Sequence, residues 1–223
     1  MGLRVVSYIF LALFLVSAAI HLLRCWQGSD KSARTKPLLI ASLLLYCAFA
    51  VQPPPWLLLA ALFASWLGDV LLMPKGNAWF ISGGISFLLS HVLFIFVYLP
   101  FIRWQNVPVW GLIAAGAVYL AAALSVMHTI RADAPKAMLV PLFLYLAANS
   151  TMNIFALSLL LGAPSYGAAA AFAGAILFFA SDSILFLSRY WKRKERIPKR
   201  GFLIMLTYIA GEALIAFGVL AVG

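Results

Sequence analysis

The chain has 223 residues, of which 65% are hydrophobic and 10% are charged. Soluble domains carry about a quarter charged residues, so this composition excludes an ordinary soluble protein, and the plentiful aromatic side chains exclude a disordered chain. One bilayer crossing takes about 20 apolar residues, so the length allows roughly eight spans and leaves no room for a soluble catalytic domain. Any chemistry must take place among the helices or at their ends.

The formal net charge of +10 does not indicate a nucleic-acid partner, because the basic residues lie in short connections between apolar runs. Membrane topology places basic residues in such connections. Cys25 and Cys47 lie in or beside apolar runs, without metal-ligand spacing. We interpret them as small apolar residues and not as disulfide partners.

Eight apolar segments predict an all-α integral membrane protein, a single domain made of a bundle of eight transmembrane helices. A lipid-exposed backbone must satisfy its own hydrogen bonds, which favours helices. In chain order the segments are about 5–23, 37–51, 56–73, 78–99, 109–127, 137–161, 166–187 and 202–222. The second segment is short and ends before the run Pro53-Pro54-Pro55, through which a helix does not continue.

The basic residues also predict the orientation of the chain. Connections 1–2, 3–4, 5–6 and 7–8 hold all but two of the 16 lysines and arginines: Arg24, Lys31, Arg34, Lys36, Lys75, Arg131, Lys136, Arg189, Lys192, Arg193, Lys194, Arg196, Lys199 and Arg200. The other side holds Arg4 and Arg103. Basic connections stay in the cytoplasm, so both termini are expected on the non-cytoplasmic side.

The first segment has features of a signal peptide, with Arg4 before it and Ser17-Ala18-Ala19 as a possible cleavage site. The stronger cluster of basic residues after it favours a retained helix. Asp30, Asp133 and Glu195 lie in connections and need no special explanation.

Three acidic residues lie inside apolar segments, where each costs about 3 kcal/mol at mid-membrane. Asp69 and Asp182 lie near the cytoplasmic ends of segments 56–73 and 166–187, and Glu212 lies closer to the middle of segment 202–222. At about 1.5 Å per residue, both aspartates fall roughly 5–10 Å inside the boundary, so they are expected to share one site. The alternative is that they pair at the interface with Lys75 or Arg189.

Other polar residues align with these acids by helical spacing. Ser65 lies one turn before Asp69, and Tyr208 one turn before Glu212. Tyr145, Asn149 and Asn153 share one helix face, where interhelical hydrogen bonding is their expected role. His91 is equally compatible with packing and with a site, and Glu212 is a possible partner of Tyr208 or His91.

The residues around the two aspartates resemble the YhhN family, which contains the mammalian lysoplasmalogenases. The matching residues are Gly68-Asp69 before Leu71-Leu72, then Phe80, Gly84, Phe87 and His91, and finally Ser181-Asp182 before Leu185. The resemblance implies an enzyme that cleaves the vinyl-ether bond of lysoplasmalogens, a class of lysophospholipid, with Asp69 and Asp182 as catalytic residues. Glu212 departs from the family, in which an amide is common at this position. The two aspartate motifs, four segments apart, also suggest a four-plus-four duplication.

Vinyl ethers hydrolyse by protonation at carbon, which resembles the two-carboxylate chemistry of glycoside hydrolysis. One aspartate is expected to donate the proton and the other to stabilise the cation. Residues expected to bind substrate or support the aspartates are His91, Glu212, Tyr208, Ser65, Ser181, Asn149, Asn153, Lys75 and Arg189. The last two are candidates for the lipid phosphate. No cofactor or metal is expected.

Two other functions are compatible with buried acids. A proton-coupled transporter would use them as a relay. A metal-dependent lipid hydrolase would need histidine ligands, but His21, His91 and His128 lack helical ligand spacing. Sparse cysteines and alanine-rich segments suggest a bacterial inner membrane, where the partners are membrane lipids. The oligomeric state is left open.

Overall fold

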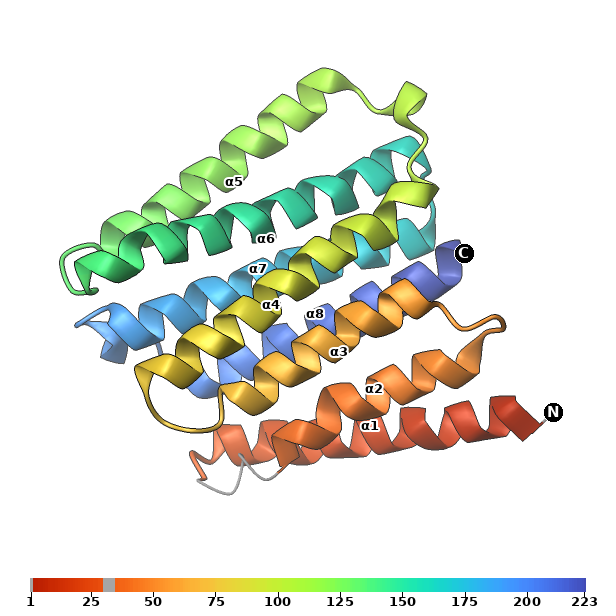
Figure 1. Ribbon diagram of the computed structural model, residues 1–223, viewed down its shortest axis with the longest axis horizontal. Helices are drawn as coiled ribbons and strands as arrows, with labels where there is room; N and C mark the ends of the chain where they lie inside the picture. Colours follow the sequence, from red (N-terminus) through yellow and green to blue (C-terminus); the bar gives the residue numbers. More distant parts are fainter. Residues whose placement is uncertain (1, 30–34) are drawn as a thin grey trace. The chain divides into compact units, whose positions relative to one another are not determined.

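The computed structural model describes residues 2–29 and 35–223, most of which are helical, with no strand among them. Asp30, Lys31 and Arg34, which the sequence analysis assigned to a connection, lie outside the described residues. The helices are α1 (Gly2–Trp26), α2 (Lys36–Ala50), α3 (Trp56–Leu71), α4 (Asn77–Tyr98), α5 (Val109–Ile130), α6 (Lys136–Gly162), α7 (Tyr166–Tyr190) and α8 (Arg200–Val222). Short 3-10 turns cover Leu99–Phe101, Trp104–Asn106 and Lys194–Arg196. Each predicted segment is therefore a helix (Figure 1).

Six of these helices are long and apolar enough to cross a membrane, namely α1, α4, α5, α6, α7 and α8. The shorter α2 and α3 are apolar but fall below membrane-spanning length. The all-helical membrane class is thus confirmed. The crossing of α2 and α3, the positions of the termini and the single-domain organisation stay predictions.

The predicted boundaries are shifted at the two helices that carry aspartates. α3 ends at Leu71, short of the expected Met73, because the N–H of Met73 bonds the carbonyl of Val70 and Pro74 follows. α7 continues to Tyr190, beyond the expected Leu187. Asp69 therefore lies in the last turn of its helix, whereas Asp182 lies about two turns before the end of α7.

The chain divides into two compact units, Met1–Val97 with Gly223, and Tyr98–Val222. In the first unit α1 lies against α2, and α2 lies against α3. Serines join α3 to α4: Ser86 Oγ donates to the carbonyl of Ala64 at 2.7 Å, and Ser90 Oγ to that of Ala61 at 3.0 Å. A Cβ at Gly68 would lie 2.7 Å from the Phe87 ring, so a larger residue does not fit there.

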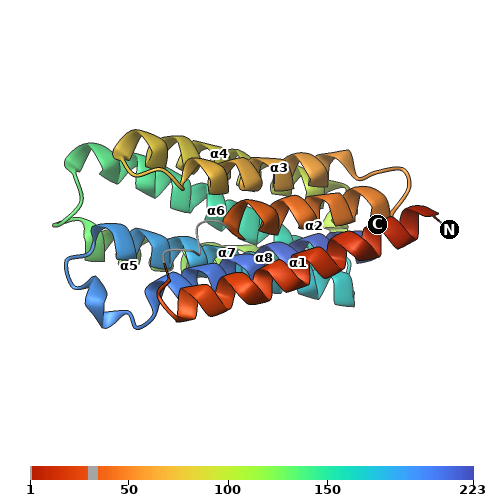
Figure 2. The same cartoon turned by 90° about the horizontal axis from the view of Figure 1, so that it is seen from below.

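In the second unit α7 and α8 lie side by side along a seam of small residues (Figures 1 and 2). Glycines face one another in two pairs, Gly167 with Gly218 and Gly174 with Gly211. An added Cβ at any of them would lie 2.5–2.9 Å from the carbonyl oxygen of its partner. One heptad after Gly174, the Ser181 hydroxyl donates to the carbonyl of Ile204 at 3.0 Å. Small residues at this spacing let the two backbones approach closely.

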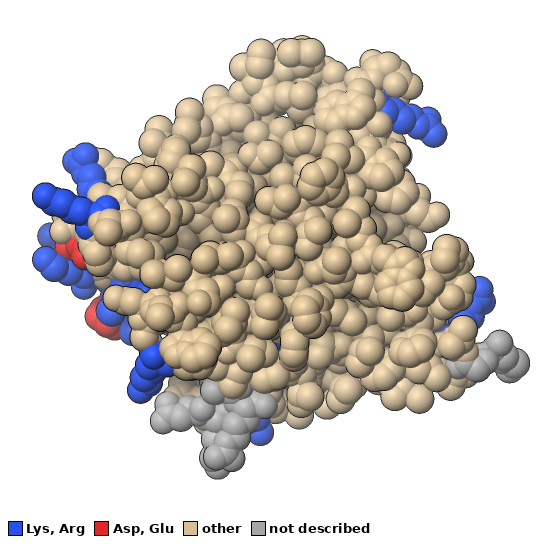
Figure 3. Space-filling model, viewed as in Figure 1, with Lys and Arg blue, Asp and Glu red and all other residues tan. Residues whose placement is uncertain are grey.

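On the face shown in Figure 3 the visible Lys, Arg, Asp and Glu side chains lie at the margins, and other residues cover most of the surface. At one end of the second unit, Asp133 connects the α5–α6 turn to the residues after α7. Its carboxylate accepts a hydrogen bond from the backbone N–H of Lys192 at 3.0 Å and lies 3.3 Å from the ammonium of the same residue. The two connections are therefore held together.

Candidate active site

Asp182 of α7 is a buried carboxyl group, 4% exposed, with two donors on the same oxygen. The Tyr145 hydroxyl donates to Oδ2 at 2.9 Å, and the Asn149 side-chain amide donates to Oδ2 at 2.8 Å. Both donors come from α6, one helical turn apart, and so reach α7 from the same face. Burying a carboxyl group is costly unless it is hydrogen-bonded, and α6 supplies these bonds.

The hydrogen bonds continue from Asn149 away from the carboxyl group. Asn153 Nδ2 donates to both the backbone carbonyl and Oδ1 of Asn149, each at 3.0 Å. The Tyr119 hydroxyl of α5 donates to Asn153 Oδ1 at 2.8 Å. The predicted polar face of Tyr145, Asn149 and Asn153 is confirmed, and it links α5 to α7.

Tyr119 is a residue that the sequence analysis missed. It lies in the middle of α5 among alanine, valine and leucine, and its ring makes an edge contact with Phe179 at 5.3 Å between centroids. A single tyrosine within an apolar span was the available signal. Its partner on α6 is not visible from spacing within one helix.

Asp69 of α3 is also buried, at 2% exposure, and pairs with a lysine. The distance from Lys36 Nζ to Asp69 Oδ1 is 3.0 Å, and the Lys36 side chain is 17% exposed. Next to this pair, the Trp66 indole N–H donates to the carbonyl of Pro37 at 2.9 Å. The start of α2 is thus attached to the end of α3.

From the sequence, Lys36 was expected to act in topology alone, and Lys75 or Arg189 were the cations with which the aspartates would pair in the alternative interpretation. The structure shows an ion pair between Asp69 and Lys36, and Lys75 is exposed in the α3–α4 connection. The signal in the sequence was a lysine directly before the proline that opens an apolar segment. Lys75 stays a prediction for the lipid phosphate, as does Arg189, which lies in the last turn of α7 with its guanidinium 5.7 Å from the Tyr190 ring centre.

The two predicted serines take part in helix–helix hydrogen bonds. The hydroxyls of Ser65 and Ser90 lie 2.7 Å apart between α3 and α4. Ser181 donates to α8, as described above. These contacts give both serines a structural role, and a role in substrate binding stays a prediction.

The remaining predicted residues are buried. His91 in α4 and Glu212 in α8 are each 0% exposed, and Tyr208 is 4% exposed with its ring in edge contact with Phe178 at 5.5 Å between centroids. Burial confirms that they face inward. Pairing of Glu212 with Tyr208 or His91 stays a prediction.

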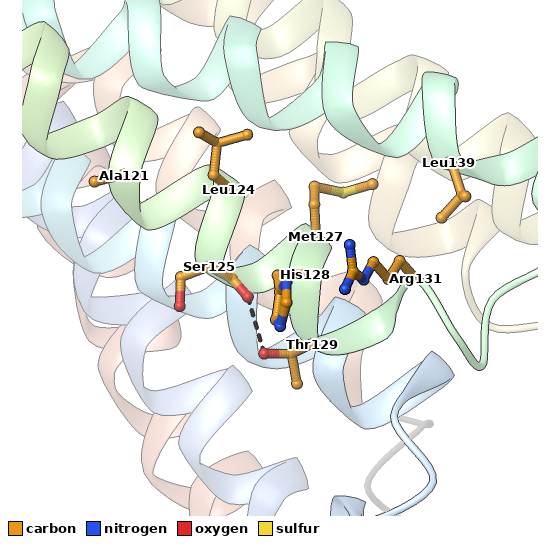
Figure 4. A pocket seen from close by; sticks show the side chains of 8 residues that line it. All are labelled: Ala121, Leu124, Ser125, Met127, His128, Thr129, Arg131 and Leu139. Carbon is orange, nitrogen blue, oxygen red and sulfur yellow. Dashed lines mark hydrogen bonds between the residues drawn. The ribbon is translucent and has the colours of Figure 1, made fainter.

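A cavity of about 620 Å³ lies at the C-terminal end of α5 (Figure 4). The residues that line it are Ala121, Leu124, Ser125, Met127, His128, Thr129, Arg131 and Leu139. None of the predicted site residues is among them. The Thr129 hydroxyl donates to the carbonyl of Ser125 at 2.8 Å, so it is used within α5 itself.

Metal ligands do not cluster in the part of the chain that the structure describes. No three His, Cys, Asp or Glu side chains lie close enough together there to hold an ion. The described residues therefore offer no ligand set to which a metal can be assigned.

Apolar helices of membrane length and acidic side chains buried inside them define an integral membrane protein with ionisable groups in its interior. Such groups mark functional sites in membrane proteins. The chain belongs to the YhhN family, whose profile matches residues 31–219. The resemblance seen in the two aspartate motifs is thereby confirmed.

Similar proteins have been named in two mycobacteria. The chain is 32% identical over 206 residues to proteins called lysoplasmalogenase from Mycobacterium bovis and Mycobacterium tuberculosis. Each alignment covers 88% of this chain and 75% of the relative. No solved structure matches the chain significantly.

Proposed function

We propose that the protein is a membrane-embedded hydrolase that cleaves the vinyl-ether bond of lysoplasmalogens to a fatty aldehyde and a glycerophospho-ethanolamine or -choline. Membership of the YhhN family and the name of the mycobacterial relatives support this activity. The observation that carries the proposal is Asp182, a buried carboxyl group with two donors on one oxygen in a family motif. The membrane we propose is the bacterial inner membrane, with both termini on the non-cytoplasmic side.

We assign the proton donor to Asp182. The hydrogen-bond donors Tyr145 and Asn149 are neutral, so these two bonds do not require the carboxyl group to be ionised. In the first step the carboxyl proton passes to the vinyl carbon distant from the ether oxygen. A C–H bond forms as the double bond opens, and the positive charge moves to the oxygen and its adjacent carbon.

We assign the anionic role to Asp69, because the ammonium of Lys36 at 3.0 Å favours a carboxylate. Negative charge stabilises the oxocarbenium ion and orients water. Water then adds to the former vinyl carbon bonded to the ether oxygen and returns one proton to the Asp182 carboxylate. The hemiacetal breaks its C–O bond to the glycerol, giving aldehyde and alcohol, so that water is consumed and the acid is regenerated.

The test uses purified protein with alkenyl, alkyl and acyl lysophospholipids and mass spectrometry of the products. We expect cleavage of the alkenyl species alone, and a loss of about a hundredfold or more for Asp69→Asn and for Asp182→Asn. Asp133→Asn is the matched control, because it makes the same change at an aspartate in the α5–α6 connection, outside the apolar helices, and it should retain activity. Wild-type aldehyde release by both folded site variants would overturn the mechanism. Movement of the lipid across proteoliposomes without bond cleavage would favour a transporter instead.

A further inference from the structure

The hydrogen bonds that lead to Asp182 have a fixed direction. A backbone carbonyl can only accept, so the bond to the carbonyl of Asn149 places the NH₂ group of Asn153 on that side. The Oδ1 of Asn153 then faces Tyr119, whose hydroxyl must donate. Rotating the Asn153 amide by half a turn would set two oxygens against each other.

The same NH₂ group determines the orientation of the next amide. It also donates to Oδ1 of Asn149, so Asn149 presents its own NH₂ group to Asp182 Oδ2. Tyr145 donates to that same oxygen. Asn149 can only donate through this amide nitrogen, so the direction of its bond to Oδ2 is fixed, whereas the Tyr145 hydroxyl can donate or accept.

We infer that Tyr119, Asn153 and Asn149 form a positioning chain that fixes the amide donor on Oδ2 of Asp182 and so orients the carboxyl group that gives its proton to the substrate. This inference rests on the proposed function in taking Asp182 as the proton donor. Tyr119 is only half-buried, on α5, and acts on a buried carboxyl group of α7 through two amides of α6. Within this scheme the three residues contact no substrate.

Interhelical hydrogen bonds also have a purely structural use, and the two roles predict different kinetics. A structural bond that is lost lowers stability and leaves the turnover of the folded fraction unchanged. A positioning bond that is lost lowers kcat with KM unchanged, because it acts on the proton transfer and not on lipid binding. It also shifts the pH profile of kcat, since the environment of the acid has changed.

The first variant is Tyr119→Phe, which removes the hydroxyl and keeps the ring against Phe179. We expect kcat on the alkenyl lysolipid to fall about tenfold with unchanged KM. Tyr166→Phe is the matched control, because Tyr166 is 98% exposed and should leave kcat unchanged. A Tyr119→Phe protein with wild-type kcat and pH profile would overturn the inference.

The second variant is Asn149→Asp, which keeps the shape but removes the amide donor to Asp182. We expect a larger loss of kcat, about a hundredfold. The double variant with Tyr119→Phe and Asn149→Asp should have the same kcat as Asn149→Asp alone, because Tyr119 acts on Asp182 through Asn149. Losses that simply multiply would show independent effects and contradict a chain. Asn106→Asp controls for the loss of an asparagine hydrogen bond elsewhere in this unit, since Asn106 donates to the carbonyl of Gly162.

An infrared measurement separates this inference from the proposed function, because it needs no substrate. The carbonyl stretch of a protonated Asp182 is assigned by its loss in Asp182→Asn. We expect that band to shift in Tyr119→Phe and not in Tyr166→Phe. A band that is unaffected by Tyr119→Phe would overturn the positioning chain, even in an active enzyme. A shifted band in a protein that cleaves no alkenyl lipid would keep the chain and overturn the function.

Discussion

Lys36 shows most clearly what one residue contributes beyond its sequence pattern. Its ammonium neutralises a carboxylate that is 2% exposed, and both groups lie within helices of the first unit. Removing one partner of a buried pair is far more costly than removing both, because it leaves an uncompensated charge. Substituting Lys36 therefore tests whether Asp69 is anionic in the folded protein.

For Lys36→Met we expect a loss of about 3 kcal/mol of unfolding free energy, with much of it restored in the double variant with Asp69→Asn. Denaturant unfolding in detergent, monitored by tryptophan fluorescence, measures the unfolding free energy of the single and the double variant. Lys75→Met serves as control, because it changes an exposed lysine of the α3–α4 connection. Equal stability of Lys36→Met and wild type would show that the ion pair contributes nothing, and the anionic role of Asp69 would lose its support.

Asp133 provides a pH-dependent contact outside the apolar helices. The backbone N–H of Lys192 and, to a lesser degree, its ammonium lower the pKa of the Asp133 carboxyl below its ordinary value. A carboxyl group whose pKa is lowered in the folded state stabilises the protein at pH values above its ordinary pKa. This contribution is lost as the pH falls through the pKa of the folded state. Asp133→Asn should therefore be less stable than wild type at neutral pH and equal to it in strong acid. Thermal unfolding at both pH values checks this; a difference that grows in acid would contradict the contact.

At the scale of helices, the packing of α7 on α8 positions Asp182. The heptad that carries Gly167 and Gly174 continues to Ser181, the neighbour of Asp182. A shift between these helices would therefore move the carboxyl group away from its donors on α6. We therefore expect the proposed site to need close packing of the two backbones.

Gly174→Ala tests this packing, because the new Cβ would lie 2.6 Å from the carbonyl oxygen of Gly211. Overpacking of this kind costs about 1–3 kcal/mol, and we expect reduced thermal stability together with reduced activity. Gly116→Ala is the matched control, since a Cβ at Gly116 in α5 meets nothing within 4 Å. That substitution should leave stability unchanged or raise it by up to about 1 kcal/mol. A Gly174→Ala protein as stable as wild type would show that the contact between α7 and α8 can relax to accommodate the added methyl group.

The helices and the polar face of α6 could be predicted from the sequence, because hydropathy and the helical repeat are properties of one segment. The contacts of Lys36 and Tyr119 could not, because each joins residues of different helices. The glycine pairs of α7 and α8 have a visible spacing of one heptad, but which helix faces which depends on packing. Spacing within a segment predicts which residues share a helix face. It does not predict which residues of other helices they contact.

At the scale of the whole molecule, the division into two units falls after Val97, at the end of the fourth helix. Asp69 lies on the third helix of the first unit, and Asp182 on the third helix of the second. This agrees with the boundary that a four-plus-four duplication requires. The duplication itself stays a prediction, since it needs a comparison of the two halves.

The orientation of the chain in its membrane is a separate prediction that cysteine labelling can test. Glu195 lies in the strongly basic α7–α8 connection, and Gln105 lies in the α4–α5 connection, which holds Arg103. In a background with Cys25 and Cys47 replaced, a membrane-impermeant thiol reagent added to intact cells should label Gln105→Cys and not Glu195→Cys. Permeabilised cells should label both, which controls for accessibility. Basic connections stay in the cytoplasm because translocating their charge is unfavourable, so labelling of Glu195→Cys alone in intact cells would place the termini in the cytoplasm. The lysolipid headgroup would then approach the aspartates from the opposite side of the membrane.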